Sequence, residues 1–462
     1  MVVSPSYEEN CKALTFAHDE ILKWVGSVGA SFSTGKYHLM HFKAPWSREP
    51  DCKLIVNIEG FDTEHEPVDT LKILGVIIDR QLRWTDHITY VIQKVKAQLG
   101  RMLRFSSSSW GPPLGALVQL YVSKIVPTIT YACPAWFIYG NSGQLDWCLS
   151  GLEGIEWAKE HENESPNWRL TQHNLDRLKC LQYECLLRIS GAIKGTSASV
   201  IEKELNVEDI EVKMMRFATA HRAKILDTPE HEMLAGIRRD LMSTGKIGLN
   251  KRHPFEVLNQ QARLLANTAR NKLLKKYGQT EAARLWNQTI ERNLQINTVA
   301  RKLATTAMRN IWDEYRRDRA QRQTSRHRPL ALVENWGRSN RDRYKELTRT
   351  QSSILIQCRT EKIGLNSHLY FINKATTPEC PCGKGQQTVF HMFMQCRRLE
   401  HPRDLLEDAV GTLNFSKLLT KQVDFATKWA IIYFDLTQFK WARDHRQTML
   451  PKKQSHSLFE GT

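Results

Sequence analysis

Three cysteines and one histidine form the densest group of reactive side chains in this 462-residue chain. Cys380 and Cys382 are separated by one residue, and His391 and Cys396 follow closely. Thiolates and imidazole are preferred ligands of tetrahedral zinc, and four protein ligands leave no open position for a substrate. The spacing therefore predicts a structural zinc site. The alternative is a set of free cysteines beside an ordinary histidine.

Motifs for catalysis are scarce. The sequence contains no P-loop, no Gly-x-Ser-x-Gly motif and no His-Glu-x-x-His pair. Asp79 and Asp86 flank Trp84 like paired carboxylates for a metal ion, but we favour strand exit for Asp79 and helix capping for Asp86. Lys36 lies at the start of a predicted strand and is a candidate for phosphate contact or proton donation. A lone lysine is more often a solvated surface residue.

The charge balance points to a polyanionic partner. Lysine and arginine number 66 against 49 acidic residues, which gives a formal net charge of +17. Neutralising phosphates releases condensed counterions, so RNA and DNA are the expected partners. The candidate binding residues are Arg309, Arg316, Arg317, Arg319, Arg322, Arg326 and Arg328. The alternative is a solvated helix face balanced by Asp313, Glu314 and Asp318.

Nothing in the sequence indicates a membrane or an oxidising compartment. There is no signal peptide and no run of about eighteen apolar residues. Ten cysteines are too few for a disulfide scaffold in a chain of this length. We expect an intracellular protein, nuclear or cytoplasmic, without a membrane partner.

Apolar periodicity predicts a predominantly α fold with a small α+β part at the N-terminus and a zinc-stapled helical module at the C-terminus. An amphipathic helix is expected over residues 7–25. Strands are expected over residues 36–42, 53–58 and 71–78. Gly75 lies inside the third strand and indicates a bulge or a close backbone approach. From residue 88 onward the pattern is helical.

A long helical hairpin is predicted between Pro254 and Pro329. This interval contains no proline and a single glycine, Gly278, at which the chain is expected to turn. The polar tail, residues 451–462, is expected to be disordered.

Several short motifs along the chain occur in an order that is typical of one protein family. Near the N-terminus they are Glu8-Glu-Asn-Cys-Lys12, Trp24, Gly29-Ala-Ser-Phe32, the segment 36–42, Leu74-Gly-Val76 and Leu82-x-Trp84-x-x-His87-Ile88. Later they are Leu120-Tyr121, Pro127, Tyr131-Ala132, Trp136, Leu178, Gln182, Leu187-Arg-Ile-Ser-Gly191, Thr196-Ser197, Gln357-Cys-Arg-Thr360, Gly364-Leu-Asn366 and the cysteine and histidine cluster. This set resembles the late palm, thumb and zinc module of non-LTR (LINE-type) retrotransposon reverse transcriptases.

The resemblance implies a domain order. It implies a palm remnant at 1–87, a helical thumb and connection at 88–230, the basic helical hairpin at 231–342, a helical zinc module of Cys-Cys-His-Cys type at 343–450 and the tail at 451–462. Leu74, Gly75 and Val76 fall on the primer grip of the family. Lys36 falls on its lysine motif, where the side chain is thought to protonate the pyrophosphate leaving group.

Departures from the family pattern limit the expected activity. The parent polymerases hold magnesium with three aspartates, one in an early strand and two in a Tyr/Phe-x-Asp-Asp hairpin, and none of the three is present. No Asp-Gly-Ser motif of ribonuclease H is found either. We therefore expect a polymerase fragment that begins after the catalytic hairpin, is inactive alone and at most binds RNA or DNA. The alternatives are a subunit that completes a palm-bearing polymerase chain in trans, and the inert product of a decayed element.

Overall fold

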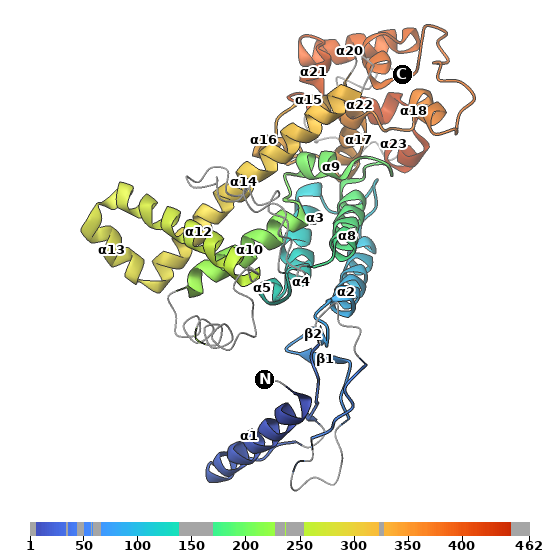
Figure 1. The fold of residues 1–462 in the computed structure, drawn as a ribbon. Helices are drawn as coiled ribbons and strands as arrows, with labels where there is room; N and C mark the ends of the chain where they lie inside the picture. The colour runs from blue at the N-terminus through green and yellow to red at the C-terminus, as the bar shows by residue number, and fades with distance from the viewer. Residues whose placement is uncertain are drawn as a thin grey trace.

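The fold is described by a computed structural model and is mostly helical, as predicted (Figure 1). The structure describes residues 6–33, 36–43, 50–56, 58, 66–137, 170–226, 236, 254–322 and 328–444. Arg326, the tail 451–462 and most of 227–253 lie outside these ranges. No helix in the described part of the chain is both long enough and apolar enough to span a bilayer.

The N-terminal part consists of one helix and one hairpin. The elements are α1 (Tyr7–Ser27), β1 (Thr70–Ile73) and β2 (Val76–Asp79). β1 and β2 are antiparallel, with Thr70 opposite Asp79. The single strand expected over residues 71–78 is therefore wrong, because Leu74 and Gly75 both have positive φ, 47° and 87°, and turn the chain there.

The other two expected strands are also wrong within the described residues. Around residues 36–42 and 53–58, Leu39 makes an isolated parallel bridge to Pro67, and no named strand forms among the described positions. A two-stranded hairpin is too small to be a sheet that buries a core. A palm remnant is thus not confirmed by the fold.

The turn into the next helix depends on Asp79. Its carboxylate accepts hydrogen bonds from the backbone N–H groups of Gln81 (3.1 Å), Arg83 (3.0 Å) and Trp84 (2.7 Å). The strand-exit role predicted for this residue is confirmed. The capping role predicted for Asp86 is wrong, because the N-cap is Trp84 in a left-handed conformation with no side-chain cap.

A helical column follows the hairpin. Its elements are α2 (Thr85–Leu103), α3 (Leu114–Leu120), the π-helix η2 (Tyr121–Ile125), α4 (Val126–Ile129), α5 (Cys133–Trp136), α8 (Gln172–Ser190), α9 (Ala198–Leu205) and α10 (Ile210–Ile225). Helices α2 and α8 run side by side, and their apolar stripes face the same core.

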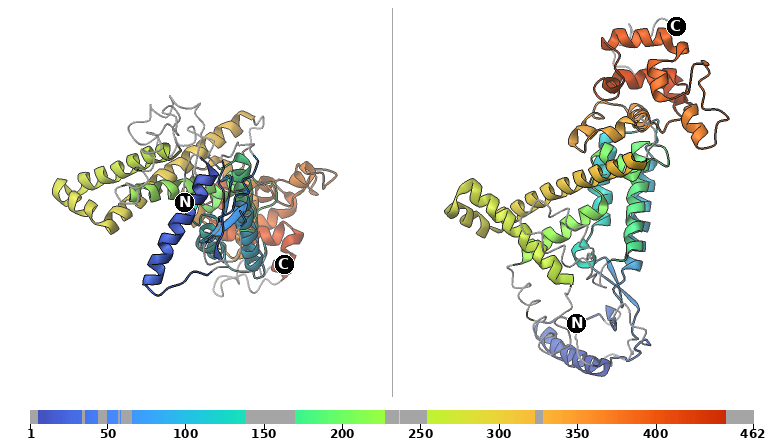
Figure 2. Two further views of the ribbon diagram at one scale, coloured as in Figure 1. Left: turned by 60° about the horizontal axis from the view of Figure 1, so that its bottom comes forward. Right: turned by 45° about the horizontal axis from the view of Figure 1, so that its top comes forward.

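A lateral arm projects from this column (Figure 2). We use this name for α12 (Pro254–Tyr277), α13 (Gln279–Asn287) and α14 (Thr289–Arg322). Gly278 has φ of 77° and ends α12, as predicted for the turn, but the second half of the expected hairpin is interrupted once more at Gln288. α12 and α14 both pack against α10, mainly through alanine, leucine, isoleucine and valine side chains.

The C-terminal part is a group of short helices around α17. The elements are α15 (Leu330–Val333), α16 (Arg338–Asp342), α17 (Arg349–Thr360), α18 (Asn366–Phe371), α19 (Val389–Met394), the 3-10 helix η3 (Arg397–Leu399), α20 (Glu400–Val410), α21 (Phe415–Leu418), α22 (Val423–Tyr433), the 3-10 helix η4 (Thr437–Phe439) and α23 (Lys440–Asp444). One hydrophobic core includes residues from Val76 to Ala442, so the column and these helices share it.

Helix α17 is buried along its whole length although much of it is polar. Arg349 donates to the carbonyl oxygens of Ser107 (2.6 Å) and Arg188 (3.2 Å). Gln357 donates to the carbonyl oxygen of Gly191 (2.8 Å). Buried polar groups cost free energy unless they are hydrogen-bonded, so these contacts fix α17 against α8 and the loop before α3.

We expect Gly191→Ala to destabilise the chain much more than Gly278→Ala. Both glycines have nearly the same φ, 74° and 77°. A Cβ at Gly191 would lie 2.2 Å from the Ser353 Oγ and 2.8 Å from its Cβ, whereas a Cβ at Gly278 meets nothing within 4 Å. The backbone cost, about 1–2 kcal/mol, is common to both, and the collision with α17 adds about 1–3 kcal/mol. Urea unfolding of the two variants measures the difference; equal losses would contradict this packing.

Candidate metal centre and nucleic-acid interface

The four predicted ligands meet in one cluster. The ligand atoms of Cys380, Cys382, His391 and Cys396 all lie within 4.8 Å of one another. The sulfurs of Cys380 and Cys396 are 3.8 Å apart, and the Cys382 sulfur is 3.2 Å from His391 Nε2. Two sulfurs at tetrahedral zinc, each about 2.3 Å from the ion, are separated by roughly 3.8 Å. The cluster can therefore hold one tetrahedral metal ion.

A tight loop and one helical turn place these ligands. The N–H of Cys380 donates to the carbonyl oxygen of Gly385 (2.8 Å), and Gly383 and Gly385 have φ of 69° and 123°, which favour glycine. Thr388 caps α19 by accepting from the N–H of His391 (3.1 Å). Cys380 and Cys382 thus lie in a tight loop, His391 lies in the first turn of the capped helix α19, and Cys396 follows the end of that helix. We call residues 379–396 the metal loop.

The thiols of Cys380 and Cys382 have pKa values that are shifted in opposite directions. The pKa of the Cys382 thiol is lowered to about 6. Burial alone would raise it, but a hydrogen bond from the N–H of Lys384 and hydrogen bonds with the other cluster side chains outweigh burial. Burial raises the pKa of Cys380 to about 12. A bound cation would stabilise both thiolates, so binding at neutral pH would release protons.

The basic residues proposed for nucleic acid do not form one stripe. At 3.6 residues per turn, Arg309, Arg317, Arg319 and Arg322 point in different directions around α14, and all four are exposed. Arg316 is half-buried, forms an ion pair with Asp313 (2.8 Å) and donates to the carbonyl oxygen of Val333 (2.8 Å). For Arg316 the geometry favours the alternative of a balanced helix face.

Arg328 is exposed just after the arm, and Arg326 lies outside the described residues. Additional cations lie further back along the same helix. Arg301 and Lys302 are exposed on α14, and the charge of Lys302, after burial, lowers the pKa of Lys272 on α12. Positive charge therefore extends along the arm beyond the residues that sequence analysis selected.

The three residues assigned to the primer grip form the tip of the β1–β2 hairpin. Leu74 is 87% exposed, while Val76 is buried. The Tyr131 hydroxyl donates to the Leu74 carbonyl oxygen (2.9 Å), and a Cβ on Gly75 would lie 3.4 Å from the Tyr131 ring. Tyr131, which belongs to one of the motifs shared with the reverse transcriptases, thus holds the tip of the hairpin.

The Lys36 side chain is exposed. The Lys36 backbone N–H donates to the carbonyl oxygen of Ser33 (3.1 Å), but within the described ranges its side chain forms no hydrogen bond or ion pair with another residue. The structure therefore gives the Lys36 side chain no fixed partner, and its assignment remains a prediction.

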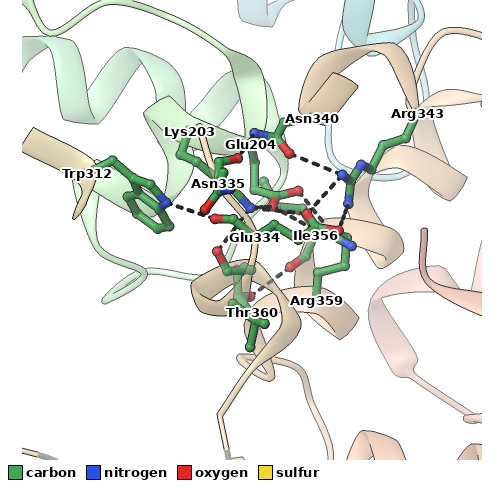
Figure 3. Close-up of polar contacts among 12 residues, drawn as sticks. Lys203, Glu204, Trp312, Glu334, Asn335, Asn340, Arg343, Ile356, Arg359 and Thr360 are labelled. Atoms are coloured by element: carbon green, nitrogen blue, oxygen red, sulfur yellow. Dashed lines mark hydrogen bonds and ion pairs between the residues drawn. The ribbon is translucent and has the colours of Figure 1, made fainter. Parts of the chain in front are cut away.

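A buried ion network joins the column, the arm and the C-terminal helices (Figure 3). Its members are Lys203, Glu204, Glu334, Arg343 and Arg359. Arg359 is bidentate to Glu204 at 2.9 and 3.0 Å, and Lys203 lies 2.9 Å from the same carboxylate. Burial raises the pKa of Glu204, but the charges of Arg359 and Lys203 lower it by more, to well below its usual range.

Neighbouring carbonyl oxygens accept further hydrogen bonds from Arg359 and Lys203. Arg359 also donates to the carbonyl oxygen of Leu419 (2.7 Å), and Lys203 donates to that of Ala331 (3.0 Å). The Trp312 indole N–H of α14 donates to the carbonyl oxygen of Glu334 (2.8 Å), as Figure 3 shows. Sequence reasoning missed the network. The available signal was the run Glu202-Lys203-Glu204 inside an otherwise apolar helix.

The comparisons with known proteins agree with the motifs. The RNA-directed DNA polymerase from the mobile element jockey of Drosophila melanogaster is 24% identical over 193 residues, which is 41% of this chain and 18% of that protein. The putative 115 kDa protein in the type-1 retrotransposable element R1DM of the same species is 24% identical over 114 residues, 25% of this chain and 11% of that protein. The chain is related to non-LTR retrotransposon reverse transcriptases.

This relationship rests on a small part of each relative. The chain spans less than a fifth of the length of either retrotransposon protein, by the shares of 18% and 11%. No protein-family model matches the chain. No solved structure matches it. What this chain does must therefore be argued from its own residues.

We expect the purified chain to carry one tightly bound metal ion and Cys396→Ser to lose it. Removing one of four ligands leaves an incomplete tetrahedral site, so the metal content should fall from about one ion per chain to nearly none. The unfolding temperature should fall as well, because metal binding stabilises the folded loop. Elemental analysis by mass spectrometry and thermal unfolding measure both. Cys180→Ser changes an exposed free cysteine and is the control; equal metal content in the two variants would contradict the site.

We expect Glu204→Gln to cost about 3–5 kcal/mol of unfolding free energy, because the buried charges of Lys203 and Arg359 would lose the fully buried one of their two carboxylate partners. Chemical denaturation with tryptophan fluorescence measures the loss. The control is Glu281→Gln, which breaks an exposed pair with Arg284 (2.6 Å) and should change stability little. A small loss for Glu204→Gln would show that the network is not a structural requirement.

Proposed function

We propose that this chain is a nucleic-acid-binding segment of a retrotransposon reverse transcriptase, and that it binds RNA and DNA without polymerising. The observation that carries this proposal is α14. It is a 34-residue helix that buries one side against α10 and α12 and leaves six of its cations, at 301, 302, 309, 317, 319 and 322, exposed on the other sides. Arginine and lysine on a fixed helix contact phosphates without any catalytic centre.

The charge on α14 is in excess. From Arg301 to Arg322 the helix has seven basic and three acidic residues. Within the described residues, none of the exposed cations at 301, 302, 309, 317, 319 and 322 forms an ion pair. An unpaired cationic surface on a chain of net charge +17 favours a polyanion over a balanced solvated face.

We propose binding without polymerisation because of the carboxylates that a polymerase needs to bind magnesium. Polymerases of this class require carboxylates for two magnesium ions, and the sequence contains no Asp-Asp pair. Magnesium would belong to a complete parent polymerase. We assign the Cys-Cys-His-Cys cluster to a structural zinc ion, since three soft thiolates and one imidazole complete a tetrahedron without an open position.

A second candidate function is completion of an aspartate-bearing polymerase chain. It is favoured by α1, where Ile21 and Trp24 are 48% and 65% exposed one helical turn apart, and Val28 follows at 56%. Apolar side chains in such a row are suited to a protein interface. In this case the binding segment would act as a subunit.

We expect Arg309→Gln combined with Arg317→Gln to weaken binding of labelled RNA and duplex DNA. Each lost phosphate contact should reduce the slope of log affinity against log salt by about 1. The matched control on the same helix is Arg316→Gln, because Arg316 is already engaged by Asp313 and Val333. Fluorescence anisotropy over a salt series measures the slopes.

Primer extension in the same samples separates the candidates. Extension by this chain alone would overturn the proposal. Extension that appears only when an aspartate-bearing polymerase chain is added would support the second candidate. Absence of any salt-sensitive binding would leave an inert product of a decayed element.

A further inference from the structure

The middle of α14 carries positive charge and no negative charge. From residue 292 to residue 312 the helix contains four basic residues and no acidic one. The arm as a whole, from residue 254 to 312, has ten basic and three acidic residues. Arg301, Lys302 and Arg309 are exposed, and none of them forms an ion pair within the described residues. This part of the arm therefore attracts a polyanion over several helical turns.

Helical spacing places these three cations along the two edges of one face. At 3.6 residues per turn, Lys302 points about 100° and Arg309 about 80° away from Arg301 around the helix axis. Thr305 and Thr298 point about 40° and 60° away from Arg301, so both lie between the two edges. Both threonines are exposed. We call the side of α14 formed by these five residues the arm face.

The opposite side of α14 is the buried one. Ile296, Ala300 and Ala307 are 0%, 5% and 0% exposed, and they point about 220°, 260° and 240° away from Arg301. α14 packs there against α10 and α12. The arm face is therefore directed away from both of these helices, on an arm that projects from the column (Figure 2).

The threonines at the centre of the arm face present acceptors and methyl groups. Thr298 Oγ1 donates to the carbonyl oxygen of Leu294 (2.8 Å), and Thr305 Oγ1 donates to that of Arg301 (2.9 Å). Each hydroxyl hydrogen is thus engaged within the helix, and each oxygen keeps the capacity to accept. In the major groove of DNA, adenine and cytosine present amino donors, and thymine presents a methyl group. A threonine side chain is suited to contact both kinds of group.

We propose that the arm face binds in the major groove of duplex DNA, with Thr298 and Thr305 toward the base edges. The cations on the two edges of the face contact the phosphates of the two strands. The groove is about 12 Å wide, and a helix with its side chains is about 10–12 Å in diameter. The major groove of an RNA duplex is deep and narrow and does not admit side chains in this way. The inference rests on the proposed nucleic-acid binding and adds the form of nucleic acid and the groove.

The test compares Thr305→Trp with Thr306→Trp in the full chain. Thr306 is the matched control: it is exposed, donates to the carbonyl oxygen of Lys302 (3.2 Å) and points about 140° away from Arg301, outside the arm face. Anisotropy with a labelled DNA duplex, and with an RNA duplex of the same sequence, gives the affinities. We expect Thr305→Trp to lose roughly tenfold for DNA, because the ring keeps the helix from the base edges, and to change little for RNA. Thr306→Trp should change neither affinity.

A second measurement identifies the groove. Guanine N7 lies in the major groove. Its methylation by dimethyl sulfate should therefore be slowed in DNA bound to the unaltered chain and to Thr306→Trp, and slowed less in DNA saturated with Thr305→Trp. Unprotected guanine N7 in the complex with the unaltered chain would overturn the inference. If Thr305→Trp lowers the unfolding temperature, Thr298→Trp repeats the comparison at the other central position.

The outcomes separate this inference from the proposed function. If the two tryptophan variants have equal DNA affinity while binding stays salt-sensitive, the groove is overturned and the proposed function stands. If the unaltered chain binds the RNA duplex as tightly as the DNA duplex, the cations contact phosphates from outside the groove, and the inference is again overturned. If the unaltered chain binds neither RNA nor DNA, both proposals fall.

Discussion

The arrangement of this molecule depends on burying a polar helix. α17 lies at the centre of the C-terminal helices with all of its residues inaccessible, yet it carries two arginines, two glutamines and several hydroxyls. Each of these groups would cost free energy if it lacked a partner. The partners come from segments that are distant in sequence: Ser107 and Ser109 before α3, Gly191 after α8, Glu204 on α9 and Asp424 at the start of α22. These contacts fix the position of the column relative to the C-terminal helices.

This constraint also explains why several motif residues occur where they do. Gly191 allows α8 to end against Ser353, and Gln357 and Arg359 of the Gln-Cys-Arg-Thr motif bind the Gly191 carbonyl oxygen and the Glu204 carboxylate. These residues make structural contacts between segments. A structural role therefore accounts for their presence.

Sequence reasoning predicted local features well and long-range ones poorly. The cysteine and histidine ligands and the break at Gly278 depend on residue type and spacing, which are visible in the sequence. The hairpin at Leu74 and Gly75 was read as one strand, because a non-glycine residue at positive φ is rare and gives no sequence signal. Glu204 and Arg359 are 155 positions apart, so their pairing had no local pattern.

Helix α14 connects two very different environments. One end lies at the tip of the lateral arm, and near the other end Trp312 contacts the buried ion network. At 1.5 Å per residue its 34 residues extend about 50 Å, the length of roughly fifteen base pairs of duplex. The helix therefore sets how far the arm extends from the core. A force that acts at the tip of the arm is transmitted along the helix to the buried ion network, where the column and the C-terminal helices meet.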